Sequence, residues 1–186
     1  MTISKTFLTA DGLLEDSFTL GDAIIESGFH PTHIVGIWRG GAPIGIAVQE
    51  LLEFRGYPCD HIAMRTSSYS GIDQQDRHVR VLGLNYLIDN LDREHSLLVV
   101  DDVFDSGRSI EALLGELAAK CRRNLPATIK VATVYYKPSR NQTDLTPDYY
   151  VHETDDWLVF PHELQGLTPD EIREHKASAN IVLGGR

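Results

Sequence analysis

The sequence of 186 residues is poor in cysteine and in basic charge. Its two cysteines, Cys59 and Cys121, lack metal-ligand spacing and favour free thiols in a reducing compartment over a disulfide scaffold. Lys and Arg number 17 against 27 Asp and Glu, which gives a net charge of −10. This balance argues against a general nucleic-acid binder, which needs a basic surface.

Long hydrophobic runs are also missing. No apolar stretch reaches membrane-spanning length, and Met1–Lys5 lacks the apolar centre of a signal peptide. The eight histidines show no metal-ligand spacing such as His-x-x-x-His. A composition of 42% hydrophobic and 24% charged residues is typical of a globular domain. We therefore expect a cytoplasmic protein whose partners include neither membrane nor nucleic acid.

Strand-like and helix-like patterns alternate along the chain. Apolar and β-branched runs predict strands over 33–38, 60–65, 79–84, 97–100, 128–136 and 149–151. Helical spacing and capping residues predict helices over 13–28, 43–54, 86–91, 109–122 and 169–176. The segment 66–77 has no periodicity and is predicted to be a long loop. This alternation predicts an α/β fold with a mostly parallel, twisted sheet flanked by helices.

The most informative segment runs from Leu97 to Ser109. Four aliphatic residues, typical of a buried strand, directly precede Asp101 and Asp102. A third carboxylate, Asp105, follows after two more residues. Open α/β sheets bind ligands at the carboxyl ends of their strands. The turn after Asp105 opens a helix, where backbone N–H groups suit a phosphate. Carboxylates beside a phosphate-binding turn indicate a divalent cation or sugar hydroxyls between them.

This segment resembles the phosphoribosyl-pyrophosphate (PRPP) signature of the type I phosphoribosyltransferases. The resemblance implies that fold, with a PRPP-binding core over 1–150 and a small C-terminal hood over 151–186. It implies that Asp101 and Asp102 hold the ribose hydroxyls and Mg²⁺, and that Asp105 is catalytic, taking the proton from purine N7. The 5′-phosphate is then expected on the turn formed by Asp105, Ser106, Gly107, Arg108 and Ser109.

Two further loops fit the same family. Arg39, Gly40 and Gly41 form a second strand-to-helix turn, and the resemblance implies that they bind pyrophosphate. It also implies a non-proline cis peptide between Arg39 and Gly40. Ser68 and Tyr69 resemble the loop of the 6-oxopurine branch that closes over PRPP, as part of a flexible lid over about 66–80. The alternative for this segment is a surface hairpin.

The base is expected to meet three residues. Lys137 precedes a proline at a strand end and matches the donor to the O6 atom of the purine, an acceptor that adenine lacks. Trp157 matches a stacking ring, and Leu158 matches a backbone carbonyl at the purine edge. Glu163 is a candidate for holding a magnesium-bound water. The alternative is that Trp157 packs in the core and Lys137 is solvated.

The resemblance therefore implies a purine salvage enzyme. It would transfer the phosphoribosyl group from PRPP to N9 of hypoxanthine, guanine or xanthine, giving IMP, GMP or XMP and pyrophosphate. A homodimer or homotetramer is implied, with the helix from Pro43 at the interface. Three alternatives stay open: an adenine enzyme, a pyrimidine enzyme, and a PRPP-sensing regulator.

Overall fold

The computed structural model describes residues 5–70 and 77–176. The chain forms two compact units, one of residues 14–155 and one of residues 1–13 with 156–186. We describe each unit by itself. Over the described ranges, no helix combines the length and the apolar character needed to cross a membrane. Cys59 and Cys121 are both free thiols, as the sequence predicts.

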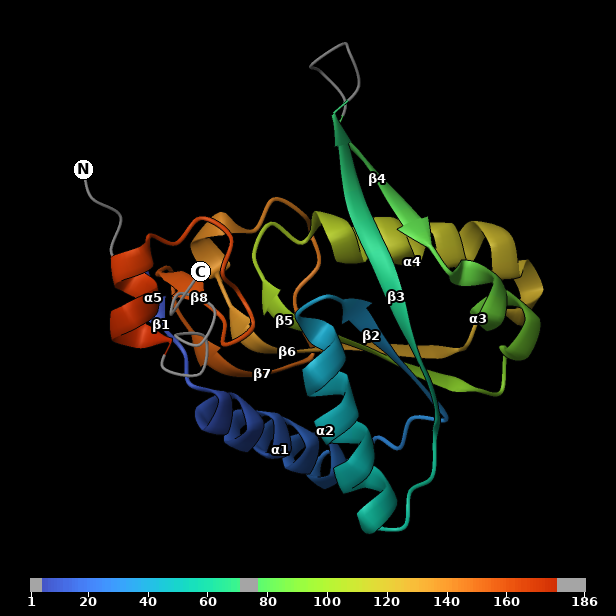
Figure 1. The fold of residues 1–186 in the computed structure, drawn as a ribbon. Helices are drawn as coiled ribbons and strands as arrows, with labels where there is room; N and C mark the ends of the chain where they lie inside the picture. The colour runs from blue at the N-terminus through green and yellow to red at the C-terminus, as the bar shows by residue number, and fades with distance from the viewer. Residues whose placement is uncertain (1–4, 71–76, 177–186) are drawn as a thin grey trace, which may run out of the picture. The chain divides into compact units, whose positions relative to one another are not determined.

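The larger unit is built on a six-stranded sheet in the order β4-β3-β2-β5-β6-β7 (Figure 1). Its strands are β2 (His33–Trp38), β3 (Asp60–Ser70), β4 (Arg77–Leu82), β5 (Ser96–Phe104), β6 (Thr128–Tyr136) and β7 (Tyr149–Glu153). Every neighbouring pair is parallel except β3 with β4. The predicted mostly parallel α/β sheet is therefore confirmed.

Helices cover both faces of this sheet. Helices α1 (Ala10–Glu26) and α2 (Gly41–Phe54) lie on one face, and α3 (Leu84–Asn90) and α4 (Arg108–Cys121) on the other (Figure 1). The run Leu97–Val100 on β5 is fully buried, because a central parallel strand is covered from both sides. Helix α4 buries a stripe at helical spacing, formed by Ile110, Leu113, Leu117 and Cys121.

The segment after β3 differs from the sequence prediction. The predicted loop over 66–77 is wrong at its ends, because β3 continues to Ser70 and pairs antiparallel with β4. Ser68 pairs with Val79 and Tyr69 with His78. The run of Ser, Thr and Tyr has no hydrophobic period, so only the pairing of its backbone reveals the strand. The middle of the predicted lid, 71–76, lies outside the described residues.

The smaller unit contains two strands and a helix. Strand β1 (Lys5–Phe7) pairs parallel with β8 (Trp157–Val159), and α5 (Pro169–His175) follows. Three-residue strands are too short to show a period, and the sequence analysis missed both. The predicted capping box of α5 is confirmed: Glu171 N donates to the Thr168 hydroxyl, and Thr168 N donates to the Glu171 carboxylate. Lys5 Nζ lies 2.7 Å from Glu171 Oε1.

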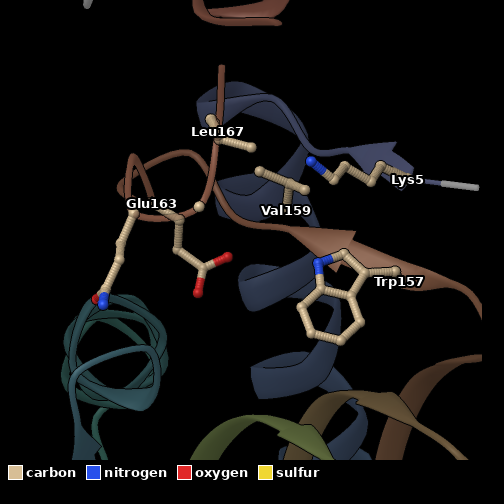
Figure 2. A pocket seen from close by; sticks show the side chains of 7 residues that line it. Lys5, Trp157, Val159, Glu163 and Leu167 are labelled. Carbon is tan, nitrogen blue, oxygen red and sulfur yellow. The ribbon is translucent and has the colours of Figure 1, made fainter. Parts of the chain in front are cut away.

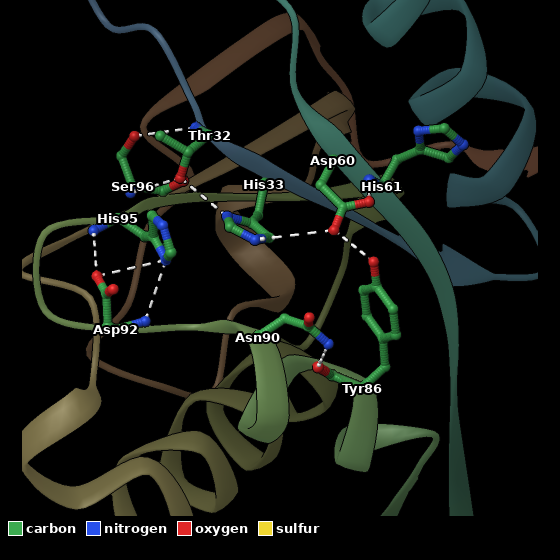
Figure 3. A network of polar contacts seen from close by, with 9 residues as sticks. All are labelled: Thr32, His33, Asp60, His61, Tyr86, Asn90, Asp92, His95 and Ser96. Atoms are coloured by element: carbon green, nitrogen blue, oxygen red, sulfur yellow. Dashed lines mark hydrogen bonds and ion pairs between the residues drawn. The ribbon is translucent and has the colours of Figure 1, made fainter.

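A polar network joins the amino ends of β2, β3 and β5 (Figure 3). The Thr32 hydroxyl donates to Ser96 O at 3.0 Å, so its 2.9 Å contact with His33 Nδ1 makes that nitrogen the donor. The other ring nitrogen of His33, Nε2, faces Asp60 Oδ2 at 3.9 Å. On its other side the His33 ring meets the His95 ring, with centroids 4.6 Å apart. His33 itself is buried, and this burial favours its neutral form.

We expect His33 to make the stability of the protein depend on pH. Burial, and then the charge of nearby His95, lower the pKa of His33 below its ordinary value of 6.5. Between the folded pKa and 6.5 the unfolded chain binds more protons, so the free energy of unfolding rises with pH and levels off above 6.5. Urea unfolding measured between pH 5 and about 7 tests this dependence on the titration of His33.

His33→Asn keeps an N–H for Thr32 but does not titrate, so it should flatten this slope. His162→Asn alters an exposed histidine and should preserve the slope. An equal slope in the wild type and in His33→Asn would contradict the assignment.

Candidate active site

The site lies where the strand order of the larger unit reverses. From β2 the chain builds β3 on one side and later places β5 on the other. The turns that follow β2 and β5 therefore meet at the carboxyl edge of the sheet, the usual ligand position in such folds. Strand β2 pairs with β5 only as far as Gly36 and Val100, so the two strands separate before they reach the turns that follow them.

Two glycines allow these turns to touch. A Cβ atom on Gly40 would lie 1.7 Å from Asp102 Oδ2, and one on Gly41 would lie 2.4 Å from Val100 O. Any side chain at either position would displace the acidic segment. The structure therefore brings the predicted pyrophosphate turn against the predicted ribose-binding carboxylates, with Gly40 beside the Asp102 side chain and Gly41 beside the backbone of Val100 and Asp101.

The turn after β2 contains a non-proline cis peptide, but not at the predicted bond. The cis bond joins Trp38 to Arg39 rather than Arg39 to Gly40. Trp38 is the last residue of β2, so the bond lies at the end of the strand itself. Arg39 is exposed, and Gly40 is buried as the N-cap of α2.

Asp101 and Asp102 lie inside β5, which continues to Phe104 and remains paired with β6. Asp102 N donates to Asp101 Oδ1 at 2.9 Å, and Val103 N donates to Asp102 Oδ1 at 2.8 Å. Burial raises the pKa of Asp101 well above its ordinary value, and the charge of Asp102 raises it further. A half-buried pair of neighbouring carboxylates is stabilised by a cation or by hydroxyl donors.

This pair fits Mg²⁺ by its chemistry. Mg²⁺ prefers oxygen ligands, and it is commonly held by one or two carboxylates together with substrate phosphates and water. Across residues 5–70 and 77–176, no three His, Cys, Asp or Glu side chains gather as metal ligands. Asp101 and Asp102 are therefore the residues that could hold the ion, with the remaining positions left to substrate oxygens.

The turn from Asp105 to Ser109 has the shape of an anion site. Gly107 has a φ of 76°, a left-handed conformation that disfavours side chains, and it precedes α4, which begins at Arg108. A Cβ there would also lie 2.5 Å from Thr143 Oγ1. Ser106 and Ser109 are half-buried, and Arg108 is exposed. The N–H groups at the start of this helix of 14 residues suit a phosphate.

Asp105 lies between two cations from the turn after β6. Its Oδ1 is 3.0 Å from Arg140 Nε, and its Oδ2 is 3.9 Å from Lys137 Nζ. Lys137 is only 4% exposed and its backbone N donates to Phe104 O at 2.9 Å. The structure thus brings the predicted catalytic acid beside the predicted O6 donor, and it rejects a solvated Lys137.

The sequence analysis missed Arg140. It lies in the short 3-10 turn Pro138–Arg140, which returns the chain toward the end of β5. Its contact with Asp105 depends on the pairing of β5 with β6. The spacing of residues in the sequence does not predict this pairing. Pro138 at the strand end could have indicated a tight turn. It could not have indicated that Arg140 of this turn contacts Asp105.

The remaining predicted site residues belong to the smaller unit. Trp157 is 48% exposed on β8, which rejects a core position, whereas Leu158 is buried. Trp157 and Glu163 line one pocket of about 220 Å³ (Figure 2). Glu163 Oε2 accepts a hydrogen bond from Phe160 N at 3.0 Å.

Comparisons with known proteins agree with this geometry. The family model described as "Phosphoribosyl transferase domain" matches residues 16–166. Xanthine-guanine phosphoribosyltransferase of Cereibacter sphaeroides is 32% identical over 70% of this chain and 68% of its own. Bifunctional protein PyrR of Corynebacterium diphtheriae is 28% identical over 78% of this chain and 77% of its own.

A solved structure shares the fold over most of its length. The purine phosphoribosyltransferase of Pyrococcus horikoshii has a TM-score of 0.69 and 26% identity, covering 88% of this chain and 97% of that one. The matched range 16–166 includes both turns, the acidic strand end and the Lys137–Arg140 turn. The chain therefore belongs to the phosphoribosyltransferase family, with the type I fold.

Proposed function

We propose that the protein is a 6-oxopurine phosphoribosyltransferase of purine salvage, cytoplasmic and magnesium-dependent. It would transfer the phosphoribosyl group of PRPP to N9 of hypoxanthine, guanine or xanthine and release pyrophosphate. The observation that carries this proposal is the buried ammonium of Lys137, 3.9 Å from the carboxylate of Asp105, at the sheet edge where the two turns meet. A fixed cation there suits a carbonyl oxygen on the ring.

In this proposal the larger unit binds PRPP. The backbone N–H groups from Ser106 to Ser109, with the hydroxyls of these two serines, hold the 5′-phosphate. Asp101 and Asp102 accept hydrogen bonds from the ribose hydroxyls. Arg39 and the backbone of Gly40–Gly41 bind the pyrophosphate group. Ser68 and Tyr69 on β3 belong to the lid that excludes water from the sugar during transfer.

Mg²⁺ held at Asp101 and Asp102 would supply positive charge to the departing pyrophosphate. The residues of the chain do the rest. The bond from C1′ to the pyrophosphate oxygen breaks, C1′ develops positive charge, and the N9 electron pair forms the new bond. Asp105 accepts the proton that leaves purine N7. Positioning and charge stabilisation supply most of the rate, because no covalent intermediate is needed.

Recognition of the base is divided among three residues in this proposal. Lys137 donates to O6, Trp157 stacks on the ring, and the backbone carbonyl of Leu158 meets the purine edge. The exposed Trp157 indole favours stacking, because two flat aromatic rings bury apolar surface when they stack face to face. Adenine carries an amino group in place of O6. This group donates hydrogen bonds, so it cannot accept one from the Lys137 ammonium.

Helix α2 is the proposed interface of a homodimer or homotetramer. Ile46 and Phe54 are exposed on α2, and Trp38 is exposed at the end of β2. Trp38 and Ile46 also line a pocket of about 590 Å³ formed with β2 and β3. Exposed apolar surface of this kind favours association, which the sedimentation of the purified protein would measure.

A panel of bases tests the function. With PRPP and Mg²⁺ we expect turnover of one or more of hypoxanthine, guanine and xanthine, and none of adenine. Lys137→Gln should lower kcat/KM for these purines about 10- to 100-fold, the usual loss for a charged hydrogen bond. Lys120→Gln, which alters an exposed lysine paired with Glu116, is the control. PRPP binding without turnover of any purine would instead favour a pyrimidine enzyme or a PRPP-sensing regulator.

Asp105→Asn tests the proton acceptor. We expect kcat to fall roughly 100-fold, because the amide cannot take the N7 proton, with both KM values changed less than about threefold. Steady-state kinetics with each substrate varied measures this split. Asp144→Asn, an exposed site in the adjacent loop, should leave kcat unchanged. An unaltered kcat in Asp105→Asn would reject its role.

Gly40→Ala tests the contact between the two turns. The new methyl group would occupy the place of the Asp102 carboxylate, so the affinity for PRPP should fall roughly 10- to 100-fold. Calorimetric titration with PRPP and Mg²⁺ measures it. Gly115→Ala is the matched control, because its Cβ meets open space within α4. Equal PRPP affinity in Gly40→Ala and the wild type would mean that the contact is dispensable.

A further inference from the structure

Thr133 carries a buried hydroxyl that finds no hydrogen-bond partner within the described residues. The residue lies in β6, between β5 and β7, and is 0% exposed (Figure 1). A buried polar atom without a partner lowers the stability of the folded state, and most such atoms in folded proteins are paired. The presence of this hydroxyl therefore needs a reason.

Packing within β6 does not supply that reason. The residues on either side of Thr133, Ala132 and Val134, are fully buried and apolar. Valine has the branched shape of threonine and is equally suited to a buried strand. A valine at this position would fill the same space without an unpaired hydroxyl, so the reason lies in a neighbouring strand.

The pairing of the strands places two polar residues beside Thr133. Its partner in register is Tyr150 on β7 and Asp101 on β5. The Tyr150 hydroxyl donates to Glu153 Oε1 at 2.8 Å, and that side chain is 43% exposed. Neighbouring strands lie only about 4.8 Å apart. Asp101 is therefore the acceptor that the sheet brings within reach of the Thr133 hydroxyl.

The half-buried Asp101 side chain is oriented by its own chain and by the turn after β2. Its Oδ1 accepts from Asp102 N at 2.9 Å, and a Cβ on Gly41 would lie 3.1 Å from the same oxygen. Carboxylates that hold an ion are usually oriented in turn by hydrogen bonds from neighbouring groups. A hydroxyl on the adjacent strand suits that task.

We infer that Thr133 is a positioning residue of the PRPP site, whose hydroxyl donates to the Asp101 carboxylate when PRPP and Mg²⁺ are bound there. The inference rests on the part of the proposed function that assigns PRPP and Mg²⁺ to Asp101 and Asp102. The hydroxyl then lowers the stability of the free protein and raises its affinity for the ligand.

Thr133→Val tests the inference, because it removes the hydroxyl and keeps the shape. Without ligand the free energy of unfolding should rise, since a methyl group replaces an unpaired buried hydroxyl. The affinity for PRPP in the presence of Mg²⁺ should fall about 10- to 100-fold, the usual loss when a group that orients an ion's ligand is removed. Urea unfolding and calorimetric titration measure the two effects.

Thr133→Ser is the rescue variant, because it keeps the hydroxyl and loses the methyl group. Its stability should fall, since a small cavity is left in the core. Its PRPP affinity should stay within roughly threefold of the wild type. Thr128→Val, at the exposed amino end of the same strand, should change neither quantity. A purely structural role would not move stability and affinity in opposite directions.

Steady-state kinetics gives an independent measurement. In Thr133→Val the KM for PRPP should rise, while the KM for the purine changes less than about threefold, because the hydroxyl acts on the sugar side of the reaction.

The outcomes separate the two proposals. Equal PRPP affinity in Thr133→Val and the wild type, in an enzyme that turns over a 6-oxopurine, overturns the inference and leaves the function intact. A loss of stability in Thr133→Val also overturns it, because the hydroxyl would then have a partner, such as a bound water, in the free protein. A wild type that binds PRPP but turns over no purine overturns the proposed function, and the PRPP affinities still decide the role of Thr133. A wild type that does not bind PRPP overturns both.

Discussion

The contact between the backbone of Gly40–Gly41 and the acidic end of β5 is the constraint on which the site depends. It exists because neither glycine has a side chain, and a methyl group on Gly40 would occupy the position of the Asp102 carboxylate. The parallel sheet makes the contact possible by placing the ends of β2 and β5 side by side at the switch in strand order. The turn proposed to bind pyrophosphate and the carboxylates proposed to bind the ribose thus lie against each other.

That closeness has an electrostatic consequence. The acidic strand end is half-buried, and desolvation together with the charge of Asp102 raises the pKa of Asp101. This strand end therefore favours a ligand that brings positive charge or hydroxyl donors. A chain of net charge −10 can still bind an anion as large as PRPP, because its cations are local. Lys137 and Arg140 flank Asp105, and Arg39 lies on the turn beside the acids. The local distribution of charge at this edge of the sheet, rather than the total charge, decides which ligand is bound.

The sequence predicts most of the larger unit for a simple reason. Buried parallel strands such as Leu97–Val100 appear in the sequence as apolar runs. In the smaller unit, the capping box at Thr168 is likewise a local pattern with a local cause. The features it missed are non-local. Arg140 reaches Asp105 only because β5 pairs with β6, and strands β1 and β8 exist only through each other. The cis bond lies one residue before its predicted place, at the end of β2, a boundary that periodicity leaves uncertain by a residue or two.

The two units divide the labour of the proposed reaction. The groups proposed to bind sugar, phosphate and pyrophosphate, and the acid proposed to accept the proton, all lie within residues 14–155. Trp157 and Leu158, which are proposed to stack on the ring and to meet its edge, belong to the other unit, whereas Lys137, the proposed donor to O6, lies within residues 14–155. Substitutions at Trp157 can therefore change which purine is preferred while the residues proposed for the transfer are conserved, because individual contacts can change on a fold that is retained.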